Sequence, residues 1–134
     1  MALRVTMIQI PAMVAFQHGA GGVAAFLVSF VEVLRFPAEG SAFGLASGIL
    51  GLAIGAATFS GSMVASAKLA NAMRQTPIVL FRHNAVLGVL AAALAALGLF
   101  ALVAAGPLLL AASLALVLLA IVLGAAFAIR VGGA

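Results

Sequence analysis

His18 is the ionisable side chain whose place in the sequence best suits chemistry. It lies in the stretch AFQHGAGGVAAFLVSF, residues 15–30, whose other side chains are almost all apolar or small. Histidine changes charge between about pH 5 and 8, and ionisable residues inside apolar segments are rare and generally functional. Two interpretations stay open: a neutral histidine hydrogen-bonded to a neighbouring helix, or a proton carrier.

The residues at helical spacing from His18 are small or polar, namely Gly22, Ala25, Ser29 and Glu32. The large apolar side chains of this segment lie mostly on other faces of the same helix. At a rise of about 1.5 Å per residue, His18 lies roughly 12 to 15 Å into the segment, near the middle of a hydrocarbon layer about 30 Å thick. We therefore expect the imidazole to face protein near the membrane midplane.

A second stripe of small and hydroxyl residues follows along the chain: Gly44, Gly48, Gly51, Gly55, Thr58, Ser62 and Ser66. Such spacing places these residues on one face of a helix. Small residues there let two helix backbones approach closely, and each hydroxyl bond across the interface contributes about 0.6 to 2 kcal/mol. The glycines, with Gly22 of the first segment, are interpreted as packing residues. Thr58 and Ser62 either pack or act as hydrogen-bonding neighbours of His18.

The composition defines the elements that must position these residues. Of the 134 residues, 67% are hydrophobic and only 6% are charged, and the mean hydropathy is +1.42. A membrane helix needs about 20 apolar residues, which leaves room for about four spans and no soluble domain. We predict an all-α integral membrane protein, one membrane domain over residues 1–134, with four transmembrane helices and short loops.

The four predicted helices cover about residues 8–34, 42–67, 85–105 and 107–129. A short polar turn at 35–41 separates the first two, and residues 68–84 form the one substantial loop. In this basic loop His83 is interpreted as a solvated interfacial histidine beside Arg82.

Charge predicts the orientation. Five of the six basic residues belong to one side, against Arg35 on the other: Arg4, Lys68, Arg74, Arg82 and Arg130. Because positive charge accumulates on the cytoplasmic side, both termini and the loop 68–84 are predicted to be cytoplasmic. The net charge of +4 is therefore a topology signal, and no nucleic-acid partner is expected.

Several kinds of site are not expected. The chain has no cysteine, and its two histidines have no carboxylate nearby in sequence, so no metal site is predicted. The segment HGAGG follows no strand and lacks the Lys-Ser/Thr ending of a phosphate loop, so no cofactor-binding or catalytic residue is predicted. Glu32 and Glu39 are interpreted as interfacial charges paired with Arg35, or as lining a proton entrance.

Four motifs follow one another along the chain, and their order is typical of one protein family: IPAMVAFQHGAGGVAAFLVSF, IGAATFSGSMVASAKL, TPIVLFRHN and AIRVGGA. Together they resemble the membrane domain of the beta subunit of proton-translocating NAD(P) transhydrogenase, over most of the chain. The resemblance implies a role in proton translocation for His18, and in coupling for Gly55 and Ser62.

The same resemblance implies the partners and the setting. The chain is expected in the bilayer of the bacterial inner membrane, in a hetero-oligomer with other transhydrogenase membrane helices and nucleotide-binding domains. NAD and NADP would bind to those partner domains and not to this segment. The chain would thus be the membrane part of an oxidoreductase, not catalytic on its own.

The family pattern is incomplete in this sequence. The family has helices upstream of Arg4, and after the segment that matches VGGA it continues into a further helix and the NADP-binding domain. The segment Leu80 to His83 also has one residue fewer than the family's loop. The chain is therefore expected to be a piece of a larger subunit, a split subunit or a degenerate relative.

Two other functions remain. A small four-helix proton-coupled transporter would place a carboxylate within its first span, whereas Glu32 lies near the end of that span. A structural assembly subunit would not depend on His18 for the activity of its complex.

Overall fold

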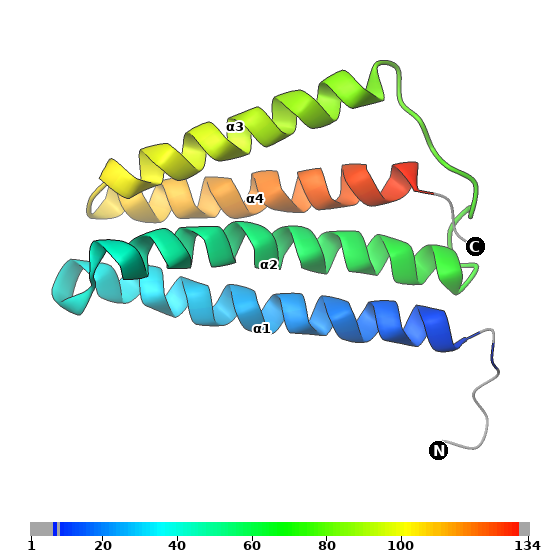
Figure 1. Cartoon of the computed structure of the whole chain (residues 1–134), viewed down its shortest axis with the longest axis horizontal. Helices are drawn as coiled ribbons and strands as arrows, with labels where there is room; N and C mark the ends of the chain where they lie inside the picture. The colour runs from blue at the N-terminus through cyan, green and yellow to red at the C-terminus, as the bar shows by residue number, and fades with distance from the viewer. Residues whose placement is uncertain (1–6, 8, 132–134) are drawn as a thin grey trace.

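The computed structural model of the chain describes Met7 and residues 9–131. Arg4 and Ile8, used above for the orientation and for the start of the first helix, lie outside the described residues. The described chain forms four helices: α1 (Ile10–Glu39), α2 (Ala42–Leu69), α3 (His83–Val103) and α4 (Pro107–Arg130) (Figure 1). All four are long and apolar enough to cross a membrane. The predicted all-α membrane architecture is confirmed.

The helix ends follow from local sequence. Ser41 caps α2, because its hydroxyl accepts a hydrogen bond of 3.0 Å from the backbone N–H of Gly44. Pro107 occupies the first turn of α4, where a missing N–H costs little. α1 passes through Pro37 and ends at Glu39, beyond the predicted end near residue 34. Membrane helices tolerate proline because neighbouring groups satisfy the freed backbone, so the turn is only residues 40–41.

The helices lie side by side in the order α1, α2, α4, α3 (Figure 1). α4 therefore lies between α2 and α3, and α1 packs along α2. We call the end with the 104–106 turn the turn end, and the end with residues 70–82 the loop end. α3 diverges from α4 toward the loop end (Figure 1).

Most of the buried apolar core lies where α2, α3 and α4 meet toward the turn end. Its residues are Leu45, Ile49, Leu52, Ala101, Ala104, Leu109, Ala112 and Leu116, with Val33 of α1. Because α3 and α4 separate toward the loop end, side chains fill that half less completely. A groove with polar lining residues lies in that half.

α1 and α2 approach each other closely at Gly22 and Gly55. A Cβ added to Gly22 would lie 2.9 Å from the carbonyl oxygen of Gly55, and one added to Gly55 would lie 2.8 Å from that of Gly22. Gly48 and Gly51 continue the contact toward the turn end, against Val33 and Ser29 respectively. Each glycine thus leaves room for the opposite helix.

Replacing these glycines by alanine should weaken the α1–α2 contact. We expect Gly22→Ala and Gly55→Ala each to lower the free energy of unfolding in mild detergent by about 1 to 3 kcal/mol, the usual cost of overpacking. Gly21→Ala is the matched control, because a Cβ at Gly21 meets nothing within 4 Å. Equal stability for the Gly21 and Gly22 variants would contradict the contact.

Candidate functional site

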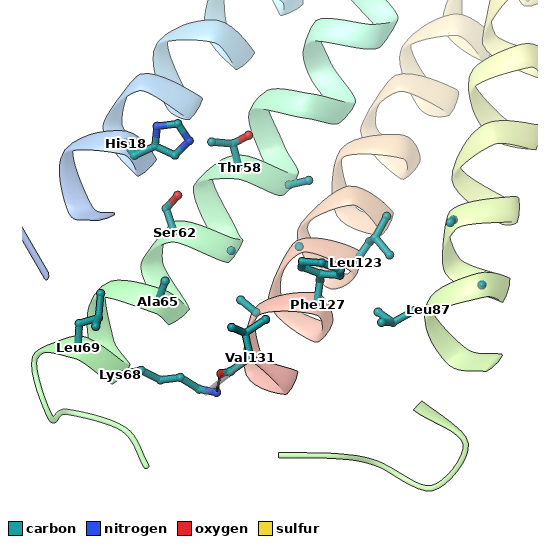
Figure 2. A pocket seen from close by; sticks show the side chains of 16 residues that line it. His18, Thr58, Ser62, Ala65, Lys68, Leu69, Leu87, Leu123, Phe127 and Val131 are labelled. Atoms are coloured by element: carbon teal, nitrogen blue, oxygen red, sulfur yellow. Dashed lines mark hydrogen bonds between the residues drawn. The ribbon is translucent and has the colours of Figure 1, made fainter. Parts of the chain in front are cut away.

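A groove of about 980 Å³ opens toward the loop end and is lined by all four helices (Figure 2). Its polar lining residues are His18 of α1 and Thr58, Ser62 and Lys68 of α2. The remaining wall is apolar or small and includes Leu87 of α3 and Gly61, Leu123, Gly124 and Phe127. The groove therefore places one imidazole, two hydroxyls and one ammonium group along an apolar surface.

The structure brings His18, Thr58 and Ser62 together. Figure 2 shows the imidazole leaning from α1 toward α2, and Thr58 and Ser62 projecting from successive turns of α2 toward it. Across the described part of the chain, these three side chains have no protein hydrogen-bond partner. Polar groups that line a roomy groove in this way can be bridged by water.

His18 and Thr58 also line a second groove of about 670 Å³. Its other lining residues run from Val14 and Gln17, on the loop-end side of His18, to Gly22, Ala25, Ile54 and Gly55, which lie about one to two helical turns toward the turn end. His18 and Thr58 thus line both grooves.

The other members of the small-residue stripe have different surroundings. Gly22 and Gly55 line the second groove, whereas Gly48 and Gly51 lie against α1 nearer the turn end. The hydroxyl of Ser66 donates a hydrogen bond of 2.8 Å to the carbonyl oxygen of Ala12 in α1. One stripe thus supplies both the helix contact and the polar lining of the grooves.

Sequence reasoning did not identify Lys68 as part of this site. Only 2% of Lys68 is exposed. Its Nζ donates hydrogen bonds of 2.6 Å to the carbonyl oxygens of Ile129 and Val131, at the C-terminal end of α4 (Figure 2). One signal was available: Lys68 continues the face of Thr58, Ser62 and Ala65 at helical spacing.

The interpretation of His83 as a solvated histidine is wrong. His83 is 3% exposed, and its Nε2 lies 2.9 Å from the carbonyl oxygen of Ala126 in α4. Nδ1 accepts a hydrogen bond of 3.2 Å from the N–H of Leu80. Because Nδ1 accepts, Nε2 is assigned as the donor to the Ala126 carbonyl. The left-handed backbone of Arg82, φ 56°, precedes α3 and turns His83 inward.

Glu32 lies far from the groove. Its Oε1 would be 2.5 Å from a Cβ added to Gly44, in the first turn of α2. The N-terminal end of a helix stabilises negative charge, so this position suits a carboxylate. The predicted pairing of Glu39 with Arg35 involves a Glu39 side chain outside those the structure describes.

The helices and the groove define an integral membrane protein with a groove beside a histidine of its first span. The sequence matches the family described as NAD(P) transhydrogenase beta subunit over residues 1–134. The chain belongs to this family, as the resemblance indicated, and forms a membrane part of the beta subunit. Comparison with individually curated proteins found no match.

A dinucleotide does not fit the residues of this groove. Pyrophosphate is usually held at a helix N-terminus that follows a strand and a glycine-rich turn, and a carboxylate holds the ribose. The described lining residues of the groove include neither aspartate nor glutamate, and Lys68 already donates to two carbonyls. No step of nucleotide chemistry is therefore assigned to these residues.

The bond of His83 to Ala126 should stabilise the packing of α3 on α4, and its bond from Leu80 should hold the loop before α3. We expect His83→Leu to lower the free energy of unfolding in detergent by about 1 to 3 kcal/mol, because it leaves two backbone groups without their partner. Asn84→Ala is the control, since it removes only the exposed side-chain contact with Arg130. If both variants unfolded like the original chain, the buried role of His83 would be refuted.

Proposed function

We propose that this chain supplies part of the proton path that couples proton movement to hydride transfer between NADH and NADP. The proposal depends on one observation: His18 lines both grooves, so its ring can be reached from both. A relay group needs this access, because it must take a proton from one side and release it to the other. NAD and NADP would bind to partner domains.

The neighbouring hydroxyls have distinct roles in this path. Thr58 lines both grooves, so it can hydrogen-bond to water on either side of the imidazole. Ser62 lies one turn nearer the loop end and lines only the larger groove. Moving one charge through 100 mV is worth about 2.3 kcal/mol, so a single titrating group suffices for useful coupling.

The distribution of charge supports an orientation. Lys68, Arg74, Arg82 and Arg130 lie at the loop end, and Arg35 lies near the turn end. Cytoplasmic loops of membrane proteins carry an excess of Lys and Arg, so we assign the loop end to the cytoplasm and the chain to a bacterial inner membrane. The nucleotide-binding domains of the hetero-oligomer would contact the chain at the loop end, and its further membrane helices would pack beside the chain in the bilayer.

Removing the imidazole should block proton movement. In the complex reconstituted into vesicles, we expect His18→Ala to lower the rate of proton pumping by about 100-fold, as is typical for loss of a proton-transfer group. Ser62→Ala should have a smaller effect of about 3- to 30-fold, because it removes one hydroxyl that can hold water beside the imidazole. Ser47→Ala is the control, because its hydroxyl bonds only locally, to Gly44.

Proton uptake and hydride transfer are measured in the same vesicles, by a pH-sensitive dye and by NADPH absorbance. Mass spectrometry of each purified complex checks that the variants retain nucleotide-binding partners. A His18→Ala complex that pumps at the original rate and the original ratio to hydride transfer would refute the relay. A chain that purifies without any dinucleotide-binding polypeptide would refute the coupling to hydride transfer.

A further inference from the structure

Lys68 is a buried cation whose described partners are backbone carbonyls. It is the only lysine in the chain, it is 2% exposed, and its two hydrogen bonds measure 2.6 Å each. A buried ammonium without partners would be very costly. Here it faces the negative end of the α4 dipole and satisfies carbonyls that have no partner within their own helix.

The same carbonyl also holds the loop. The N–H of Ile78 donates a hydrogen bond of 2.9 Å to the carbonyl oxygen of Ile129, which also accepts from Lys68. The end of α2, the middle of the 70–82 loop and the end of α4 therefore meet at one oxygen atom. Loss of the lysine would weaken the attachment of all three.

This junction lies beside the proposed proton path. Lys68 and Ala65 line the groove between Ser62 and the loop end, and Figure 2 shows the Lys68 side chain extending from α2 toward Val131. The bonds to α4 cross from the helix that bears Thr58 and Ser62 to the opposite wall. The distance between these two walls sets how much water enters.

We propose that Lys68 is a positioning residue of this path: its ammonium group ties α2 to the C-terminal end of α4 and keeps the loop end of the groove narrow beside Ser62. The inference rests on the proposed function only for its effect on coupling. The effect on the width of the groove depends on the contacts of Lys68 alone. Without the tie, water enters the groove freely and protons cross without hydride transfer.

The first test uses the unaltered side chain in the assembled complex. Mass spectrometry of this chain's peptides reports on Lys68 selectively after reaction with an amine-reactive reagent, because it separates Lys68 from the N-terminus and this chain has no other lysine. The matched control is a complex with Arg74→Lys, which supplies an exposed lysine in the same loop. We expect Lys68 to react at least about 100-fold more slowly than the introduced lysine, because two charge-assisted bonds must break before it is exposed. Equal rates would overturn the proposal.

The second test measures the groove itself. The chain has no cysteine, so Ala65→Cys introduces a single thiol on the groove wall, read by mass spectrometry after reaction with a membrane-impermeant maleimide. In the complex we expect Lys68→Met to raise the labelling rate about tenfold, the equivalent of about 1.4 kcal/mol. Lys68→Arg, which keeps the charge and the donors, should restore slow labelling. Arg74→Met, which removes an exposed charge from the same loop, should leave the rate unchanged.

The third measurement is proton leak in vesicles without nucleotide. We expect vesicles with the Lys68→Met complex to leak protons and vesicles with the Lys68→Arg complex to leak no faster than those with the original complex. Fast labelling of Ala65→Cys with no leak would support the tie but count against the proposed proton path. Unchanged labelling in Lys68→Met would overturn the tie, whatever the behaviour of His18 variants. If Lys68→Met does not assemble, fast reaction of Lys68 in the unaltered complex still overturns the proposal, and slow reaction supports it.

Discussion

The close approach of α1 and α2 at Gly22 and Gly55 is the contact on which the rest of the site depends. Each glycine lies against the backbone of the other helix, within distances that a side chain would not permit. His18 lies one turn from this contact on α1, and Thr58 lies one turn from it on α2. The imidazole and the hydroxyl are consequently neighbours because two backbones touch, and the two glycines also line the second groove.

The polar groups at the loop end show how a chain with few carboxylates accommodates its buried basic side chains. Lys68 and His83 both bond to backbone carbonyls in the last turns of α4, at Ile129, Val131 and Ala126. A helix C-terminus offers partial negative charge without a titrating group. The carbonyl acceptors of these bonds therefore do not take up a proton at low pH, as a carboxylate would. α4, which lies between α2 and α3, thereby fixes the position of both neighbours.

Sequence predicted the four spans and the two stripes, because apolar length and helical spacing are local properties. It also placed His18, Thr58 and Ser62 on facing surfaces. It missed the bonds of Lys68 and His83, whose acceptors lie 61 and 43 residues away along the chain. Those acceptors become neighbours only when α4 packs between α2 and α3. The helical continuation through Pro37 was missed because proline is read as a helix end, whereas a membrane helix tolerates it.

The most direct test of the account follows the His18 proton itself. The chain contains two histidines, so isotope-labelled histidine in this chain alone gives imidazole bands in infrared difference spectra of the complex, recorded at rest and during proton pumping. The account predicts that one labelled imidazole changes protonation during turnover, and that this change disappears in His18→Ala but not in His83→Leu. Proton pumping without any change in the labelled bands would contradict it.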